Sequence, residues 1–384
     1  MVSRQRKQVM NPPLLQGVQI LGTEIKTPVD RSFPIEEMIV IVSGTVGAAA
    51  LVLTQPDGIL GIIKKLNFSA NDGSVPRNIV DFTGVGLLEY ASNAGLNLDH
   101  ATLEMVRFQT TATNIPANSN FRIAYRVPLV HPMIQEPLRA RMVLPCHKWD
   151  QDMVLSLTIA GATEIASAGT LSGLSVEIVL VRRVVSVSLD ADILATGGYI
   201  PFDLIEQPFT IGVGVSGEQR IQIQAPGSYA NLQLRCYKGG AVVTRDVVDA
   251  VTTLGNETKW RLESGGSADR EFRFKHEQIF NEYSRPKNAL SLTGSPSMGG
   301  VQAANALFLP AGSIMLDFLG DGLNDANELG SILDLNLPQR SGLKMELVGA
   351  VANSATNGHT IYYGGHRFYG DLSPWQAGVR RAGK

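Results

Sequence analysis

The sequence contains little cysteine, little tryptophan and little charge. Of its 384 residues, 2 are Cys and 3 are Trp, and charged residues make up 18%. Two cysteines, Cys146 and Cys236, cannot build a disulfide framework, and both lie in or beside apolar strand patterns. We therefore expect buried free thiols, as in a chain that assembles in a reducing cytoplasm.

Neither a strong excess of one charge nor a long apolar run is present. The formal net charge is -2, whereas a dedicated nucleic-acid binder usually carries a strong basic excess. No stretch approaches the roughly 18 uninterrupted apolar residues of a membrane span. The segment 9–15 is interrupted by Asn11, Pro12 and Pro13, so it predicts no apolar core of a secretory signal.

Signatures of the common enzyme classes are missing as well. Glycine pairs at 239–240, 265–266 and 299–300 lack the Lys-Ser/Thr that a phosphate-binding loop requires. Cys146 and His147 are neighbours, and on a strand they would point to opposite faces, which gives the thiol no base within reach. We expect neither an enzyme nor a cofactor.

The sequence is rich in short segments in which apolar and polar residues alternate. The clearest are Phe121–Val127 and Met153–Ile159, and similar patterns recur at 232–236, 313–319 and 343–347. The longer segments Ile35–Val46 and Leu174–Val187 are apolar and β-branched, and Val18–Thr27 is expected as one strand. With 39 Gly and 19 Pro to supply turns, the pattern predicts an all-β chain of sandwiches or jelly rolls.

The same order of predicted elements occurs twice along the chain. Each half has strands, then a short aromatic helix, expected at Thr83–Ala94 and Asp269–Ser284, and then strands again. The Gly- and Pro-containing stretch Leu189–Asp203 is the expected boundary. The predicted units are a basic N-terminal arm (1–15), a first domain (16–190), a second domain (204–372) and a basic C-terminal tail (373–384).

The segment Ile115–Pro132 has the sequence IPANSNFRIAYRVPLVHP. It combines a turn of small residues, a strand in which aromatic and other apolar residues alternate with polar ones, and the tripeptide Val-Pro-Leu. Together with Leu60–Gly95, it resembles the double jelly-roll major capsid proteins of tailless icosahedral viruses. The resemblance is greatest to tectivirus-type phages with an internal membrane, and the adenovirus hexon is more distant. It implies two tandem eight-stranded jelly rolls, each with a short inserted helix.

The resemblance also implies a function. Proteins of this family form pseudo-hexagonal homotrimers that tile an icosahedral shell around a membrane vesicle and genome. The expected partners are further copies of the chain and the minor capsid, vertex and membrane proteins of the virion. The expected location is the virion capsid, assembled in the host cytoplasm.

Basic residues gather at both ends of the chain. They are Arg4, Arg6 and Lys7 at one end, and Arg380, Arg381 and Lys384 at the other. In the simpler interpretation these termini are merely polar and have no further function. If the resemblance holds, however, both ends would lie inside the shell, where they could meet anionic lipid or packaged nucleic acid.

An acidic stretch is a weak candidate for calcium, which binds clustered oxygen ligands. Its residues are Asp317, Asp321, Asn324 and Asp325. Their spacing is not that of an EF-hand loop, so a solvated turn is favoured.

A two-domain β-sandwich that binds or processes carbohydrate is the alternative function, since jelly rolls host both kinds of protein. A glycoside hydrolase needs paired carboxylates in an aromatic cleft. The candidate pair Glu36–Glu37 has no flanking Trp, and the three tryptophans, Trp149, Trp260 and Trp375, are dispersed.

Overall fold

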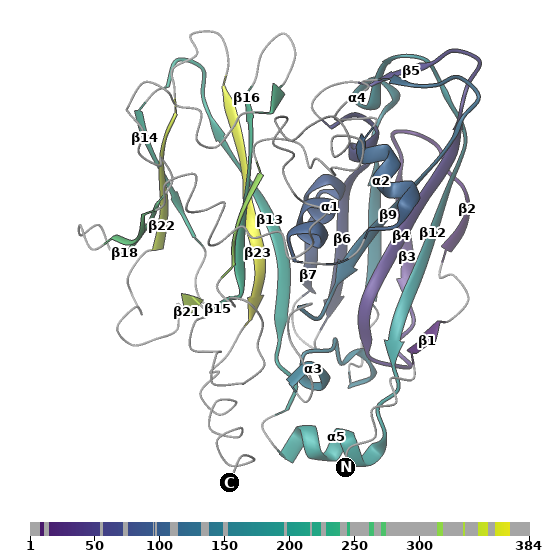
Figure 1. The fold of residues 1–384 in the computed structure, drawn as a ribbon. Helices are drawn as coiled ribbons and strands as arrows, with labels where there is room; N and C mark the ends of the chain where they lie inside the picture. Colours follow the sequence, from purple (N-terminus) through teal and green to yellow (C-terminus); the bar gives the residue numbers. More distant parts are fainter. Residues whose placement is uncertain are drawn as a thin grey trace, which may run out of the picture.

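A computed structural model of the chain shows a mostly β molecule with its long strands running side by side (Figure 1). Every structural statement below concerns the residues that it describes. These are 8–10, 15–53, 57–71, 76–94, 96, 98–107, 114–131, 138–148, 153–195, 198–215, 217–223, 228–238, 244–245, 261–264, 270–273, 313–317, 333–334, 345–351 and 358–368.

In the first half, nine of the described strands form two sheets around a shared apolar core. One sheet has the order β2-β12-β4-β9, with the short strand β1 also paired to β12, and the other has the order β3-β10-β6-β7. The strands are β1 (Gln8–Met10), β2 (Leu15–Val18), β3 (Glu24–Val29), β4 (Ile35–Val46), β6 (Ile63–Asn71), β7 (Pro76–Phe82), β9 (Asn120–Pro128), β10 (Met153–Ile159) and β12 (Leu171–Arg183).

The second half repeats this pairing with its own strands. The orders are β13-β23-β16-β20 and β14-β22-β18-β19. The strands are β13 (Phe202–Ile211), β14 (Gly217–Gln222), β16 (Asn231–Lys238), β18 (Arg261–Ser264), β19 (Arg270–Arg273), β20 (Ser313–Asp317), β22 (Met345–Val351) and β23 (His359–Phe368). In the first half β2 pairs with β12, β12 with β4 and β4 with β9. In the second half β13 pairs with β23, β23 with β16 and β16 with β20 in the same order. This is the connectivity of a jelly roll, in which eight strands form two Greek keys.

One strand pair joins the two halves into a continuous sheet. β7 of the first half lies parallel to β13 of the second, with Leu204 opposite Val80 and Ile205 opposite Asp81. The eleven-stranded sheet that results runs from β17 (Thr244–Arg245) to β3. Backbone hydrogen bonds therefore hold the halves together.

The helices are short and lie at the ends of the strands or between the halves. α1 lies between the two halves, α3 and α5 lie at the lower end of the molecule in Figure 1, and α4 lies at the upper end. α2 covers the outer edge of β9, where the Thr102 hydroxyl accepts a hydrogen bond from the Ala124 backbone N–H at 2.8 Å. The helices are α1 (Gly84–Asn93), α2 (His100–Arg107), α3 (Leu138–Arg141), α4 (Ala162–Ile165) and α5 (Val187–Ala195). No helix in the described part of the chain is long and apolar enough to cross a membrane.

The remaining described elements are short. They are the 3-10 helices η1 (Gly58–Gly61) and η3 (Cys146–Lys148), and the strands β5 (Leu51–Leu53), β8 (Asn114–Ile115), β11 (Ala166–Ala168), β15 (Ser228–Tyr229) and β21 (Leu333–Asp334). β5 pairs with β8 and β11 in a separate sheet.

Several predicted elements have the predicted bounds. Ile35–Val46 and Met153–Ile159 are β4 and β10, and buried and half-buried side chains alternate along β10 as its sequence predicts. The first predicted helix is α1, which begins after its N-cap residue Thr83. Burial alternates along β10 as the local pattern predicts, whereas α1 is buried on all sides from Gly84 to Ala91.

Other predictions were wrong in detail. Val18–Thr27 is not one strand, because a turn containing Gly22 at φ 76° separates β2 from β3. The helix expected at Asp269–Ser284 cannot start there, because Arg270–Arg273 is strand β19 with Phe272 opposite Leu262. The remainder of that prediction lies outside the described residues.

The expected boundary Leu189–Asp203 begins inside a helix. α5 occupies its first part and β13 starts at Phe202, so the connection between the halves is itself partly structured. Only one of its side chains, that of Ile193, is buried within α5.

Candidate functional site at the seam between the halves

Of the predicted site residues, only Asp317 lies within the described part of the chain. Asp317 is the last residue of β20, opposite Asn231, and the other three calcium candidates Asp321, Asn324 and Asp325 lie outside the described residues. So do the basic candidates Arg4, Arg6, Lys7, Arg380, Arg381 and Lys384. Within the described ranges, no three His, Cys, Asp or Glu residues are grouped as metal ligands would be.

Cys146 is a buried free thiol, as the sequence predicts. Its Sγ donates a hydrogen bond to the Phe33 carbonyl oxygen at 2.9 Å, and burial raises the pKa of the thiol to about 12. The neighbouring His147 lies 3.5 Å from an Asp190 carboxylate oxygen, and burial lowers its pKa although Asp190 opposes the shift. The thiol is therefore protonated at neutral pH, unlike an activated nucleophile.

The most elaborate polar site lies where α1 meets the outer face of β13, β16 and β23. We call this contact the seam. Thr83 caps α1, its hydroxyl oxygen accepting from the Gly86 backbone N–H at 3.1 Å. Glu206 on β13 in turn accepts from the Thr83 N–H at 3.1 Å and from its hydroxyl at 2.7 Å. A carboxylate is stabilised there because a helix N-terminus carries a partial positive charge.

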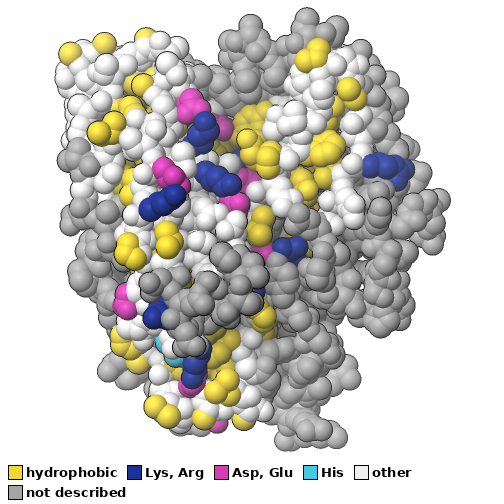
Figure 2. Space-filling view, turned by 180° about the vertical axis from the view of Figure 1, so that it is seen from behind, with side chains coloured by type: hydrophobic (Ala, Val, Ile, Leu, Met, Phe, Trp, Pro, Cys, Tyr) yellow, Lys and Arg dark blue, Asp and Glu magenta, His cyan; other side chains and the backbone are white. Residues whose placement is uncertain are grey.

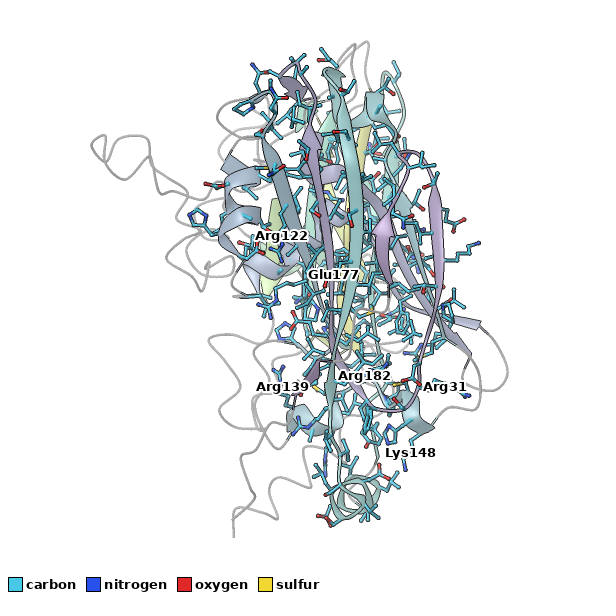
Figure 3. All side chains as sticks on the ribbon, turned by 90° about the vertical axis from the view of Figure 1, so that its right-hand side faces the viewer. Arg31, Arg122, Arg139, Lys148, Glu177 and Arg182 are labelled. Atoms are coloured by element: carbon cyan, nitrogen blue, oxygen red, sulfur yellow. The ribbon has the colours of Figure 1, made fainter. Side chains whose placement is uncertain are left out.

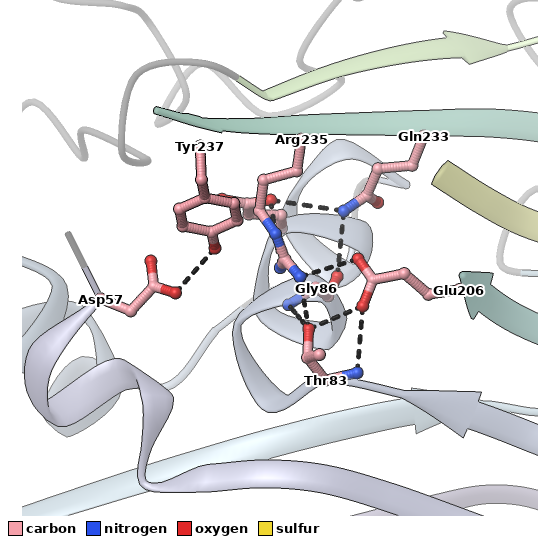
Figure 4. Close-up of polar contacts among 8 residues, drawn as sticks. Asp57, Thr83, Gly86, Glu206, Gln233, Arg235 and Tyr237 are labelled. Atoms are coloured by element: carbon pink, nitrogen blue, oxygen red, sulfur yellow. Dashed lines mark hydrogen bonds and ion pairs between the residues drawn. The ribbon is translucent and has the colours of Figure 1, made fainter. Parts of the chain in front are cut away.

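A buried arginine from β16 completes this group (Figure 4). Arg235, 1% exposed, lies 2.9 Å from a Glu206 oxygen, and its guanidinium donates to the Thr83 hydroxyl at 2.5 Å. Its other terminal nitrogen lies 3.7 Å from the carboxylate of Glu89, which is on α1 and has no exposed surface. One cation thus stands between two buried carboxylates from opposite halves.

Burial and charge act against each other in this group. Burial raises the pKa of Glu206, and Arg235 and the donors of Thr83 oppose that rise. Burial is the largest single influence and lowers the pKa of Arg235, but Glu206, Tyr237, Glu89 and Asp57 together outweigh it, so the pKa is raised overall. The arginine therefore remains a cation.

Glycines allow the close approach at the seam. A Cβ on Gly86 would lie 2.6 Å from a Glu206 carboxylate oxygen, and one on Gly364 would lie 1.8 Å from the Ile205 carbonyl oxygen. Gln233 donates to the Gly86 carbonyl at 3.2 Å across the same contact. A side chain at Gly86 would push the halves apart, whereas one at Gly364 would clash within the second half, where β23 pairs with β13.

A second buried group lies further along the seam. The Asn231 side-chain nitrogen lies 3.1 Å from the His131 ring and donates to the Tyr90 hydroxyl at 3.3 Å. The Asn231 oxygen accepts from the His366 backbone N–H at 2.9 Å. Burial lowers the pKa of His366 to about 3, so its ring is neutral in the folded chain.

A cavity of about 290 Å³ opens beside Arg235, lined by residues of both halves. Its charged groups are already paired, because Lys64 lies 2.6 Å from Glu164 and the Tyr237 hydroxyl donates to Asp57 at 2.7 Å. On the face shown in Figure 2, basic and acidic side chains lie next to one another in the same way. This arrangement is suited to holding two domains in one orientation.

The lower end of the first half carries several basic side chains. Arg31, Arg139, Lys148 and Arg182 are found there in Figure 3. Arg139 lies 3.6 Å from the buried carboxylate of Glu36, and Lys148 is paired with Asp190.

Sequence patterns alone missed the seam. In β16 the polar positions that alternate with Leu232 and Leu234 look like a solvated face, yet Gln233 and Arg235 are 2% and 1% exposed. Their partners lie more than a hundred residues away in the chain. The available signal was the run Thr83-Gly84-Val85-Gly86, an N-cap followed by two glycines where a helix former is expected.

No protein-family model and no curated protein matches this sequence. Solved structures do resemble it along its length. A chain in the atomic structure of Sulfolobus turreted icosahedral virus gives a TM-score of 0.63 at 14% identity over 97% of both chains. The PBCV-1 virus capsid gives 0.53 at 12% identity over 96% of both chains. The major capsid protein of bacteriophage PM2 gives 0.51 at 10% identity over 95% of this chain and 98% of that one.

At these identities the likeness establishes the fold. The chain is mostly β and has the architecture of the double jelly-roll capsid proteins. The predicted fold class is confirmed at that level.

Proposed function

We propose that this chain is the major capsid protein of an icosahedral virus and that its role is structural, without catalysis. One observation carries the proposal: the two halves repeat the same strand pairing and share one sheet and a buried seam. A chain of this kind is a rigid block with two similar faces. The similarity over nearly the whole chain to the capsid structures above supports the same role.

The proposed unit has two tandem eight-stranded jelly rolls, 16–190 and 204–372, each with a short inserted helix. Three chains in a ring would give six rolls and a pseudo-hexagonal homotrimer. A cyclic trimer needs a heterologous contact, in which one face of a subunit meets a different face of the next. Two similar but unequal rolls supply such faces, and a closed shell repeats each contact many times.

The proposed shell encloses a membrane vesicle and the genome, and the arm 1–15 and tail 373–384 face inward. The strand pairing supports a common direction for both. Gln8 lies opposite Arg183 at the end of β12, and Phe368 lies opposite Phe202 at the start of β13. Both positions are toward the end of the molecule that carries α3 and α5 (Figure 1).

The basic ends would then meet anionic lipid or packaged nucleic acid, with minor capsid, vertex and membrane proteins as further partners. Assembly would take place in the cytoplasm of the host, a bacterium in the tectivirus-type case. Changing Arg4, Arg6, Lys7, Arg380, Arg381 and Lys384 to Gln tests the contact by co-sedimentation with anionic liposomes, neutral liposomes and DNA. We expect lower binding to one anionic partner and unchanged oligomerisation. Equal binding of the unchanged chain and the Gln variant to anionic liposomes and to DNA would refute the role of the basic ends in these contacts.

The class of protein is tested by its assembly. Light scattering after size-exclusion chromatography should give three chain masses, and negative-stain images should show six-sided blocks or shells. A monomer that binds glycans or hydrolyses glycosides would overturn the capsid proposal in favour of the carbohydrate-active alternative.

A further inference from the structure

A second cavity lies where the first half meets the beginning of β13, and it has a volume of about 200 Å³. Its apolar walls are Ala70 on β6, Ile79 on β7 and Leu144 from the first half, and Ile200 and Phe202 from the connection and the first residue of β13. All five residues are at most 4% exposed. The cavity is therefore an apolar hollow whose walls come from both sides of the contact between the halves.

Two polar side chains also line the cavity, and both have partners. The Arg77 guanidinium donates to the Phe202 carbonyl oxygen, and the Tyr199 hydroxyl donates to Asp190 at 2.8 Å. A ligand would therefore gain little from hydrogen bonds to these groups. It would gain chiefly by covering apolar surface.

Backbone hydrogen bonds hold the walls of the cavity in place. The Ile200 N–H donates to the Arg141 carbonyl oxygen at 2.9 Å, and the Leu144 N–H donates to the Ile35 carbonyl oxygen at 3.0 Å. The remaining wall is formed by β6 and β7, which are paired strands of one sheet. A cavity persists where its surroundings cannot relax into it, so this hollow is preformed.

The size of the cavity selects a small ligand. Pockets for drug-sized molecules measure about 300–1,000 Å³, whereas a cavity of about 150 Å³ is enough to hold benzene. At about 200 Å³ the space matches one substituted ring or two small fused rings. Ordered water is a poor occupant because the apolar walls offer few hydrogen-bonding partners.

We infer that this cavity is a binding site for a small, neutral, apolar molecule of about one aromatic ring. Such a ligand would contact both halves at once and hold the start of β13 against β6 and β7. A charged ligand is disfavoured because an unpaired charge is costly to bury among apolar walls. The inference goes beyond the proposed capsid role and does not depend on shell formation.

Titration calorimetry of the purified full chain with toluene tests the inference. We expect one saturable site with a negative heat-capacity change, which marks the burial of apolar surface. Phenol, which has nearly the same size, should bind about tenfold more weakly or worse because its hydroxyl would be buried without a partner. Absence of saturable toluene binding, or equal affinities for toluene and phenol, would overturn the inference.

Decanoate distinguishes a ring from the end of an acyl chain, since both are apolar. We expect toluene to bind and decanoate to bind more weakly, because its chain is longer than one ring and carries a charged end. Saturable binding of decanoate without binding of toluene would overturn the assignment of a ring-sized ligand.

Thermal unfolding of variants locates the site. Toluene at ten times its Kd should raise the midpoint of the unchanged chain by about 2 °C. Ala70→Leu places a larger side chain in the cavity and should weaken toluene binding about tenfold or more and remove this shift. The control Ala168→Leu lies on the exposed part of β11 and should bind toluene like the unchanged chain. A folded Ala70→Leu protein with unchanged toluene affinity would overturn the inference.

A milder variant keeps the test decisive if Ala70→Leu does not fold. Ile79→Val enlarges the cavity by one methylene group, so the affinity for indole, a larger ring system, should rise several-fold relative to that for toluene. Circular dichroism establishes that the variant is folded. An unchanged ratio of the two affinities would contradict binding in this cavity.

Discussion

Single buried charges decide how firmly the two halves are joined. Arg235 neutralises Glu206 and lies beside Glu89, and all three are removed from water. A buried ion pair adds little net stability compared with apolar packing, but removing one partner leaves the other charge buried without compensation. The seam is therefore sensitive to loss of the arginine alone.

We expect Arg235→Met to lower the free energy of unfolding by roughly 3–5 kcal/mol, because the carboxylates of Glu206 and Glu89 lose their counter-charge. Urea unfolding measures the change. Lys64→Met is the matched control. It breaks the exposed pair with Glu164 and should cost less than about 1 kcal/mol. Equal losses in the two variants would show that the Arg235 network does not stabilise the seam.

The buried ring of His366 makes stability depend on pH. Its pKa is about 3 in the folded chain and about 6.5 in an unfolded one. Between these values the unfolded chain binds a proton that the folded chain does not. The free energy of unfolding therefore falls as the pH drops from about 6.5 toward 3, by about 1.4 kcal/mol per pH unit.

Urea unfolding between pH 7 and pH 4.5 measures this slope, and His366→Asn should reduce it. The control His100→Asn changes a side chain that is 89% exposed and should leave the slope unchanged. An identical slope in the His366 variant would assign the pH dependence to other groups.

At the scale of the elements, the local sequence pattern predicts a strand or helix well when contacts with distant residues favour the same secondary structure. β4 and β10 were predicted with their observed bounds because apolar period and burial agree along them, and the N-cap Thr83 identified the start of α1 although that helix is buried on all sides. The failures occur where distant residues decide. Phe272 suits a helix face as well as a strand, and pairing with Leu262 makes it part of β19.

The seam was unpredictable for the same reason. Alternation identified β16 as a strand, but it could not tell that the polar face of the strand would lie against α1. Only the two glycines after Thr83 indicated a close approach. The sequence alone identifies the basic residues at both ends of the chain. These residues lie outside the described part of the chain, so their predicted role stays a prediction.

The N-cap of α1 is an element end that also serves the seam. Thr83→Ala removes the acceptor for Gly86 N–H, a donor to Glu206 and a partner of Arg235. We expect a loss of about 2 kcal/mol or more in the free energy of unfolding. Thr83→Ser keeps the hydroxyl and should lose well under half as much in the same urea titration. Comparable losses would mean that the methyl group, not the hydroxyl, matters.

At the scale of the whole molecule, the shared sheet should make the halves unfold together. The β7–β13 pair and the Arg235 network both cross between them. We expect one calorimetric transition, with equal van't Hoff and calorimetric enthalpies. Two resolved transitions would mean that the halves are energetically independent despite the shared sheet.

The parallel β7–β13 pair also bears on how such a chain could arise from a smaller ancestor. A lone first half would leave the hydrogen-bonding edge of β7 open, and an unprotected strand edge invites pairing with other molecules. Pairing β7 with β13 of the second half converts that aggregation hazard into an internal contact. On this view, tethering the two halves in one polypeptide protects solubility during synthesis.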